Sequence, residues 1–232
     1  MANQDPEKQA AARESLRFIN DGDIVGLGTG STVYYTLQFL AEQMHQGLKI
    51  LGIPTSHQTA KIAAELKIPL TTLDEHQEID VDIDGADEID PQLALIKGGG
   101  GAFLREKIVA SAAKKLVIVG DSSKQVSVLG KAPLPVEVVP FAQALVAKEI
   151  KSLGAAVSLR QINHAEVFVT DEGHHILDCS FGQITHPRIL AQQLEEIPGV
   201  VGHGLFIGMA DVVLIGKGDK VIELRKSSDD RT

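Results

Sequence analysis

A short apolar run at residues 24–28 leads through a cluster of glycines straight into an amphipathic helix, and this arrangement constrains the fold most strongly. Apolar residues recur at helical spacing over 31–46, and a second apolar run follows at 48–53. A strand, a crossover helix and a second strand in this order form a parallel β-α-β unit. The pattern therefore predicts a parallel sheet with helices on both faces.

The rest of the chain continues this rhythm and then changes character near residue 130. Before that point we expect helices over 7–20, 57–67 and 104–113 and strands over 69–73, 79–84 and 116–119. After it we expect strands over 136–139, 156–160, 166–170, 175–179 and 200–207 and helices over 141–153 and 188–196. This second order approximates a ferredoxin-like sandwich.

Two short apolar stretches at 211–215 and 220–224 close the chain, and we expect these strands to return to the first sheet. The sequence thus predicts an α/β protein with two domains. A Rossmann-like parallel-sheet domain takes residues 1–130 and 207–232. A ferredoxin-like α+β domain, residues 131–206, is inserted into it.

Composition excludes several classes of function. The formal net charge of −9 disfavours nonspecific binding to nucleic acid or to anionic membranes. No apolar run approaches the roughly 20 residues that span a bilayer, and the polar first residues do not resemble a secretory signal. The single cysteine, Cys179, fits a reducing cytoplasm and is expected to be a small buried apolar residue.

The segment 26–32, GLGTGST, is typical of an anion cradle between a strand and a helix. Glycines let the backbone approach a ligand, and the helix start offers free N–H groups. An ordinary capped turn is the alternative, but three glycines in five residues exceed what a cap needs. Ser31 occupies the sixth position, where a dinucleotide-binding G-x-G-x-x-G motif needs glycine, and no P-loop motif occurs. A small monophosphate therefore fits best.

An acidic segment, DVDIDGADE at 80–88, has two misleading interpretations. Its first residues match a calcium loop, but the twelfth position is Pro91 instead of glutamate. Asp82-Ile-Asp84-Gly85 resembles the nucleophile motif of haloacid-dehalogenase-like phosphatases. That motif normally follows the first strand of a domain, whereas here it follows a later one. A solvated acidic turn would explain Asp80 and Asp90.

Asp84 and Asp87 flank a glycine at the end of a predicted strand, where open α/β sheets bind ligands. Four consecutive glycines then follow Lys97 at 98–101, and such a run is costly to order unless the backbone must approach a ligand. Glu106 lies at the start of the next predicted helix. It is either an ordinary first-turn carboxylate, which the helix dipole favours, or a catalytic residue. Lys124 follows the strand 116–119 and is either a phosphate ligand or a solvated surface group.

Five histidines fall in the second domain, and their spacing resembles no metal site. We expect them at the surface or at an interface: His164, His174, His175, His186 and His203.

Taken in order, six segments resemble the A type of ribose-5-phosphate isomerase. They are GLGTGST (26–32), DGADEID (84–90), KGGGGAFLREKI (97–108), DSSKQV (121–126), LGKAPLPVEVVP (129–140) and IPGVVGHGLF (197–206). The resemblance covers nearly the whole chain. It implies an enzyme without cofactor or metal, with a small sugar phosphate as its partner, that forms a homodimer or homotetramer.

The resemblance also assigns roles to matching positions. The three substrate loops are Thr29, Gly30, Ser31 and Thr32; Asp84, Gly85, Ala86 and Asp87; and Lys97, Gly98, Gly99 and Gly100. Glu106 corresponds to the proton acceptor, Lys124 to a phosphate-side lysine, and Lys8 to a candidate N-terminal phosphate lysine. Gly101 stands where the family often has alanine, which predicts a looser loop, and His186 stands where it often has aspartate.

These residue types suit an aldose–ketose isomerisation through an enediolate. Glu106 can take a proton and return it, and Lys97 with nearby N–H groups can stabilise the negative charge. Asp84 or Asp87 can hold hydroxyls, assist ring opening or exchange protons between O1 and O2, and the sequence does not separate these roles.

Three other functions compete with the isomerase. An amino-sugar-phosphate deaminase would release ammonia, and a metal-dependent phosphatase would release phosphate. A sugar-phosphate-sensing regulator would carry a helix-turn-helix and a basic face, and the sequence shows neither.

Overall fold

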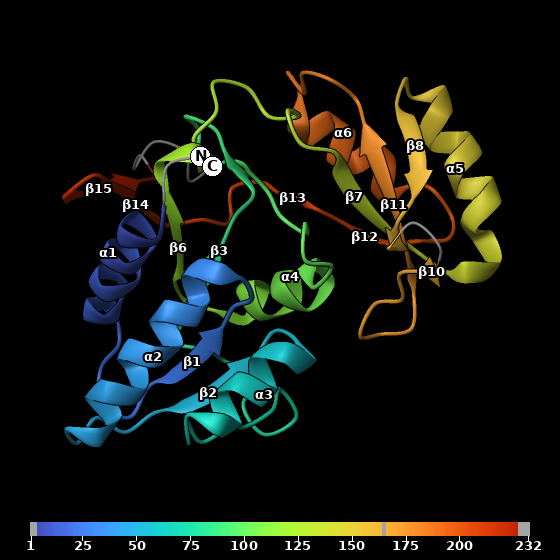
Figure 1. Ribbon diagram of the computed structural model, residues 1–232. Coiled ribbons are helices and arrows are strands. Elements are labelled where there is room, and N and C mark those ends of the chain that lie inside the picture. Colours follow the sequence, from blue (N-terminus) through green and yellow to red (C-terminus); the bar gives the residue numbers. More distant parts are fainter. Residues whose placement is uncertain (1–3, 164–165, 227–232) are drawn as a thin grey trace. The chain divides into compact units, whose positions relative to one another are not determined.

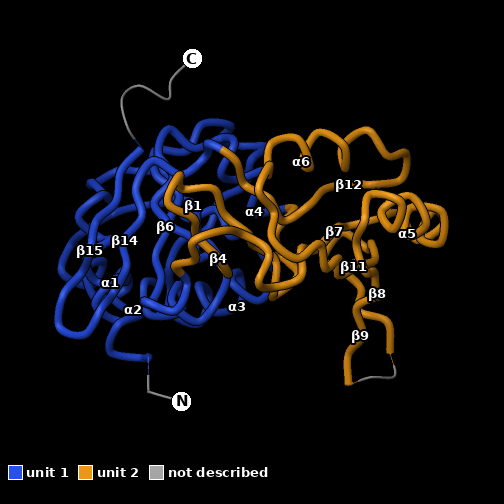
Figure 2. Tube along the Cα trace, turned by 90° about the horizontal axis from the view of Figure 1, so that it is seen from above, with its two compact units in different colours: residues 1–86, 105–124, 208–232 blue, residues 87–104, 125–207 orange. Residues whose placement is uncertain are grey.

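The computed structural model describes residues 4–163 and 166–226, which form two compact units (Figure 2). Within them, unit 1 comprises 4–86, 105–124 and 208–226. Unit 2 comprises 87–104, 125–163 and 166–207. Each unit has its own sheet and its own core.

Unit 1 is built on a six-stranded sheet with the order β15-β14-β6-β3-β1-β2 (Figure 1). The strands are β1 (Ile24–Leu27), β2 (Leu51–Pro54), β3 (Val81–Gly85), β6 (Leu116–Asp121), β14 (Val212–Lys217) and β15 (Lys220–Arg225). All neighbours are parallel except the hairpin β14–β15. The Rossmann-like parallel sheet is therefore confirmed, and the last two strands do return to it.

Helices cover both faces of this sheet, as the β-α-β rhythm predicts. They are α1 (Asp5–Ser15), η1 (Leu16–Phe18), α2 (Ser31–His45), α3 (His57–Glu65), α4 (Phe103–Ala112) and η2 (Ser122–Lys124). Apolar residues of α1 and α2 share one core with Val25, Val81 and Val117 of the strands. Val109 of α4 packs with Ile79 in a separate cluster. The strands β6 and β14 are thus largely apolar on both faces, whereas β3 alternates apolar residues with the buried Asp82 and Asp84.

Unit 2 contains a four-stranded antiparallel sheet with the order β12-β7-β11-β8. Its elements are β7 (Leu134–Val138), η3 (Pro140–Ala142), α5 (Gln143–Ser152), β8 (Ala156–Leu159), β11 (His175–Ser180), α6 (Pro187–Glu195) and β12 (Val200–His203). Both α-helices contribute to one core with β7 and β11. A β-α-β-β-α-β chain with this strand order is the ferredoxin-like sandwich, as expected.

Two small sheets in unit 2 were not expected from the sequence. One joins β4 (Glu88–Ile89), β5 (Leu95–Ile96) and β13 (Leu205–Phe206), and the other joins β9 (Gln161–Ile162) and β10 (Glu166–Val167). Each strand has two residues, so none of them shows the alternation that marks a longer strand.

One predicted strand is wrong, and another is only partly confirmed. Residues 69–73 make only a bridge between Leu70 and Gly52, because Pro69 has no N–H to donate to a ladder. In the predicted strand 166–170, residues 166–167 form β10, which pairs with β9. The predicted hairpin with β11 is limited to the bridge of Val169 with His175 and the bond from Thr170 N to His174 O.

The compact units divide the chain differently from the predicted domains over two segments, and by one residue at Ile207, which lies in unit 2. Residues 87–104 lie in unit 2 because β4 and β5 pair with β13 and not with the six-stranded sheet. Residues 125–130 lie there too, since Val126 N donates to Ile89 O and Ile184 N donates to Leu129 O.

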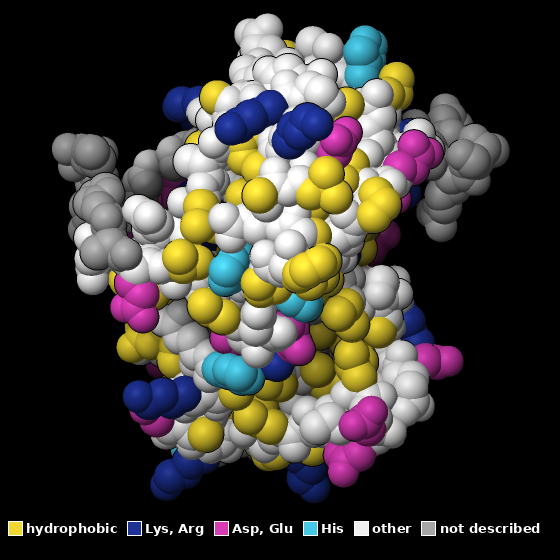
Figure 3. Space-filling view, turned by 90° about the vertical axis from the view of Figure 1, so that its right-hand side faces the viewer, with side chains coloured by type: hydrophobic (Ala, Val, Ile, Leu, Met, Phe, Trp, Pro, Cys, Tyr) yellow, Lys and Arg dark blue, Asp and Glu magenta, His cyan; other side chains and the backbone are white. Residues whose placement is uncertain are grey.

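Some large apolar side chains of unit 2 are exposed. Phe141 is fully exposed, and Leu145 and Ile189 are more than half exposed. Figure 3 shows hydrophobic side chains, with histidines among them, over one face of the molecule.

Across the described residues, none of the helices combines the length and apolar character needed to cross a membrane.

The only cysteine of the chain offers a test of the unit 2 core. Cys179 on β11 is fully buried, and burial raises the pKa of its thiol to about 12. Because the thiolate is the reactive form, we predict that a disulfide reagent leaves the native chain unlabelled while it labels the chain unfolded in guanidinium completely. Rapid labelling of the native chain would contradict this core.

Candidate functional site

Unit 1 brings three loops together at one edge of its sheet. Strands β1, β3 and β6 are adjacent and parallel, so their carboxyl ends share that edge. The chain leaves these ends at Gly28, Ala86 and Ser122. Ligands of open α/β sheets bind at this edge.

The carboxylate of Asp84 fixes the first two of these loops to each other. Its Oδ1 accepts hydrogen bonds from Thr29 N at 3.1 Å and from Gly85 N at 2.7 Å. Asp84 is fully buried, and a Cβ on Gly28 would lie only 2.3 Å from Asp84 Oδ1. Only glycine therefore allows β1 to pass this close to the carboxylate.

The hydroxyl of Thr29 lies in a cluster of four hydroxyl groups. Thr29 Oγ1 is 2.8 Å from Thr55 Oγ1, 2.9 Å from Ser56 Oγ and 3.1 Å from Thr59 Oγ1. Thr55 and Thr59 in turn donate to the carbonyls of Leu27 and Gly28. The cluster thus ties the end of β1 to the start of α3, where Ser56 caps the helix.

The helix α2 begins immediately after this clamped loop. Its N-cap is Gly30, whose φ of +125° lies in the region that favours glycine and which offers no side-chain cap. The first-turn N–H groups and the helix dipole therefore suit an anion. A pocket of about 360 Å³ adjoins this turn. Its lining includes Gly28, Thr29, Gly30, Ser31, Tyr34 and Gln58.

Two charged candidates of unit 1 lie in helical segments, Glu106 on α4 and Lys124 on the short η2. Glu106, in the first turn of α4, is only 4% exposed. Lys124 ends η2 and is half-buried. The carboxylate of Glu7 fixes the η2 turn, because it accepts hydrogen bonds from Ser122 N and Ser122 Oγ. It also accepts from Gly218 N, and this bond is the largest cause of the lowered pKa of Glu7.

The neighbour of Glu7 on α1 is the N-terminal candidate Lys8. Its Nζ lies 3.9 Å from Asp5 Oδ1. Asp5 lines the pocket beside α2.

Unit 2 contains the third loop, which starts at Lys97. This lysine is only 3% exposed, its backbone N donates to Gly204 O at 2.9 Å, and its Nζ lies 5.5 Å from the centre of the Phe206 ring. Its Nζ thus lies within cation–π distance of an aromatic face, at a position largely closed to water.

Three of the four glycines after Lys97 have close neighbours in unit 2. Gly98 has a φ of +109°, and a Cβ there would lie 2.5 Å from Phe103. Gly99 N donates to Asp87 Oδ2 at 2.7 Å. Gly101 has a φ of +85°, and Phe168 would lie 2.5 Å from its Cβ. Glycine is thus the residue that the conformation at Gly101 accommodates, whereas a looser loop there stays a prediction.

No metal centre is visible among the described residues. Over 4–163 and 166–226, no three His, Cys, Asp or Glu side chains gather where they could hold an ion.

Comparison with known proteins identifies the family. The family model for ribose 5-phosphate isomerase A (phosphoriboisomerase A) matches residues 51–220. The ribose-5-phosphate isomerase A of Parvibaculum lavamentivorans is 48% identical over 229 residues, which cover 95% of this chain and 99% of that protein. That of Roseiflexus sp. is 51% identical over 224 residues and covers 95% of this chain and 96% of its own length. The chain belongs to the ribose 5-phosphate isomerase A family.

Solved structures of the ribose 5-phosphate isomerase A family share this fold. The enzyme from Methanocaldococcus jannaschii has a TM-score of 0.92 at 38% identity and covers 97% of this chain and 100% of its own. A D-ribose-5-phosphate isomerase in complex with phospho-erythronic acid has a TM-score of 0.93 at 39% identity and covers 96% and 99%.

The residues predicted for the site divide between the units. Unit 1 holds Thr29, Gly30, Ser31, Thr32, Asp84, Gly85, Ala86, Glu106 and Lys124, and unit 2 holds Asp87, Lys97, Gly98, Gly99 and Gly100. Within unit 1 the structure brings Thr29 to Asp84, and within unit 2 it brings Asp87 to Gly99.

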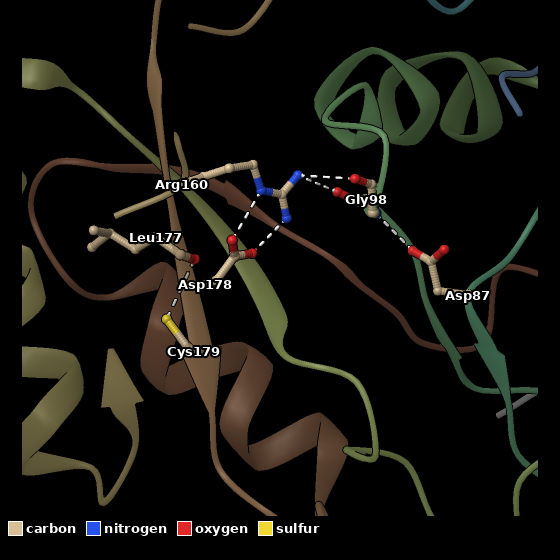
Figure 4. A network of polar contacts seen from close by, with 7 residues as sticks. Asp87, Gly98, Arg160, Leu177, Asp178 and Cys179 are labelled. Carbon is tan, nitrogen blue, oxygen red and sulfur yellow. Dashed lines mark hydrogen bonds and ion pairs between the residues drawn. The ribbon is translucent and has the colours of Figure 1, made fainter. Parts of the chain in front are cut away.

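Sequence reasoning missed the residues that support these loops. Ser56 was detectable as a helix N-cap, but nothing local marked the hydroxyls of Thr55 and Thr59. Nothing local marked Arg160 either, whose guanidinium bonds to the glycine loop (Figure 4). These partners lie far along the chain from the loops they hold.

Two expectations about surface residues are wrong, and one lies outside the described residues. Asp90 is buried, because its Oδ1 accepts from Gln92 N and Ala94 N inside a tight turn. His203 is 2% exposed, since β12 places it in the interior of unit 2. His164 falls outside the described residues.

The hydroxyl cluster predicts how Thr29 acts. Thr29→Val keeps the shape of the side chain but removes its hydroxyl, so we expect unfolding free energy to fall by about 1 kcal/mol in denaturant titrations. Thr29→Ser keeps the hydroxyl and should recover most of that loss. Equal stability of the valine variant and the wild type would show that the cluster contributes nothing.

Proposed function

We propose that this chain interconverts D-ribose 5-phosphate and D-ribulose 5-phosphate. The observation that carries the proposal is the match to full-length family members over 95% of the chain, with the glycine-rich loops, Glu106 and Lys97 all present. A related enzyme was solved with phospho-erythronic acid, a phosphorylated sugar acid, which fits a sugar phosphate as the ligand class.

Glu106 is the proposed proton acceptor. In the open-chain aldose, its carboxylate removes the proton from C2 and leaves an enediolate. The same carboxyl group then delivers a proton to C1, while a second proton moves from the oxygen on C2 to the oxygen on C1. One positioned carboxylate is sufficient for the carbon-to-carbon transfer.

Lys97 and the backbone of the glycine loop are proposed to stabilise the negative charge of the enediolate. The side chain of Lys97 is almost completely buried, and a cation acts more strongly on a nearby charge when water is excluded. Gly98 and Gly100 would present their backbone N–H groups to the same charge, since Gly99 N already donates to Asp87 Oδ2.

Asp84 and Asp87 are proposed to order the loops and to assist ring opening or proton exchange between O1 and O2. Each already holds a loop within its own unit: Asp84 Oδ1 accepts from two N–H groups, and Asp87 Oδ2 accepts from Gly99 N. The first role is thus supported for both.

The start of α2 is proposed to bind the phosphate. Its N–H groups and the hydroxyls of Ser31 and Thr32 are anion ligands of the usual kind. Lys124 is the proposed phosphate-side lysine, and Lys8 is a second candidate.

The role of Glu106 is tested by Glu106→Gln. We expect ribulose 5-phosphate formation, followed by NMR with excess chelator present, to fall about 10²- to 10⁴-fold because the amide cannot accept the proton. Exchange of the C2 proton with solvent deuterium should fall equally.

Glu42→Gln is the matched control, since Glu42 is an exposed carboxylate of unit 1 on α2. It should keep wild-type turnover. Near-normal turnover of a folded Glu106→Gln variant would rule out this base. Ammonia release from an amino-sugar phosphate, or magnesium-dependent phosphate release, would replace the isomerase with another activity.

We propose that the chain works as a homodimer or homotetramer. Exposed apolar side chains such as Phe141, Leu145 and Ile189 support self-association, because large exposed apolar groups often mark protein interfaces. Sedimentation equilibrium should give two or four times the chain mass of 24.8 kDa. A mass of one chain at every concentration would contradict this proposal.

The cytoplasm is the proposed compartment. The single cysteine fits a reducing environment, where no disulfide is needed for stability.

A further inference from the structure

The glycine loop of unit 2 is held by a charged group on each side of one peptide bond. Gly98 O and Gly99 N belong to the same planar peptide, whose C=O and N–H point in opposite directions. Arg160 Nη1 donates to Gly98 O at 2.7 Å, and Gly99 N donates to Asp87 Oδ2 at 2.7 Å. Figure 4 shows Arg160 on one side of Gly98 and Asp87 on the other. Rotation of this peptide would break both charge-assisted bonds.

The guanidinium of Arg160 is itself fixed by Asp178. Arg160 Nε donates to Asp178 Oδ2 at 3.0 Å, and Arg160 Nη2 donates to Asp178 Oδ1 at 2.5 Å. This two-point pair orients the planar guanidinium and leaves Nη1 directed at the loop. Nη1 also lies 3.3 Å from Gly99 O, so one group reaches two successive carbonyls.

Phe168 supports the same arrangement. The Cζ atom of Arg160 lies 5.8 Å from the centre of the Phe168 ring, and Phe168 N donates to Arg160 O at 3.0 Å. The ring also lies against Gly101, whose N donates to Gly98 O at 3.0 Å. Arg160 and Phe168 therefore hold both ends of the glycine run.

We propose that Arg160, oriented by Asp178, is a positioning residue that fixes the Gly98–Gly99 peptide so that the glycine loop can stabilise negative charge on the substrate. This role rests on the proposed isomerase function. A run of glycines has no side chains to hold it, so its backbone needs such fixed partners to keep one conformation. Lys97 is anchored separately through Gly204 O, so the clamp acts on the glycines that follow it.

The first test is Arg160→Gln, which removes the charge and the fork. We expect kcat for ribose 5-phosphate to fall about 10- to 100-fold, because a small misplacement of stabilising groups lowers the rate of the chemical step. KM should change little, since the phosphate is assigned to the α2 loop and the lost interaction acts in the transition state.

Two further variants separate positioning from general stability. Arg160→Lys keeps the charge but not the fork and should recover only part of kcat. Asp178→Asn frees the guanidinium and should lower kcat less than Arg160→Gln. The double variant should lose no more than Arg160→Gln if Asp178 acts through Arg160. Arg188→Gln, at an exposed arginine on α6 of the same unit, is the matched control and should keep wild-type kcat.

A second readout does not depend on activity. Amide hydrogen exchange by NMR should become faster at Gly99 and Gly101 in Arg160→Gln, while core amides of β7 and β11 stay protected. Unchanged glycine exchange would overturn the clamp, as would wild-type kcat in Arg160→Gln. If the wild-type chain did not convert ribose 5-phosphate at all, the proposed function would fail, and glycine exchange would still decide whether Arg160 holds the loop.

Discussion

The buried carboxylate of Asp84 is the constraint on which the loops of unit 1 depend. A fully buried carboxylate must be satisfied by donors, and Oδ1 of Asp84 takes the N–H groups of Thr29 and Gly85. This is possible only because Gly28 lets β1 pass within contact distance of it. The loop that results leads directly into α2. The carboxylate of Asp84 and the absence of a Cβ on Gly28 therefore help to set the direction in which α2 presents its N–H groups.

Unit 2 uses the same physical device on a different loop. Asp87 accepts from the N–H of Gly99, and Arg160 donates to the carbonyls of Gly98 and Gly99. Charged side chains of opposite sign thus hold the two polar ends of one glycine peptide. Ordering a run of four glycines is entropically costly. These charged partners explain how the run keeps one backbone conformation, in which Gly98 and Gly101 have φ angles of +109° and +85°.

The sequence was informative wherever chemistry and conformation depend on neighbours along the chain. Periodicity predicted the parallel sheet and the ferredoxin-like order, and glycine runs marked two loops whose backbone bonds to charged side chains. It was uninformative where partners are distant. Arg160 lies about 60 positions from the glycines it holds, and the register of β8 against β11 decides that it meets Asp178. Strands as short as β4 and β5 carry no period to read.

The acidic chain can hold an anion because its charges act locally. Charges more than about 10 Å away are largely screened by salt, so a net charge of −9 says little about the potential at one loop. Within unit 1 the carboxylate of Asp84 accepts backbone N–H groups, and within unit 2 that of Asp87 does the same, so the positive ends of these N–H groups lie against each carboxylate. The same bonds leave the start of α2 and the lysines as the local positive groups. Carboxylates that order the loops are thus compatible with a phosphorylated substrate, provided that each is bonded to the backbone.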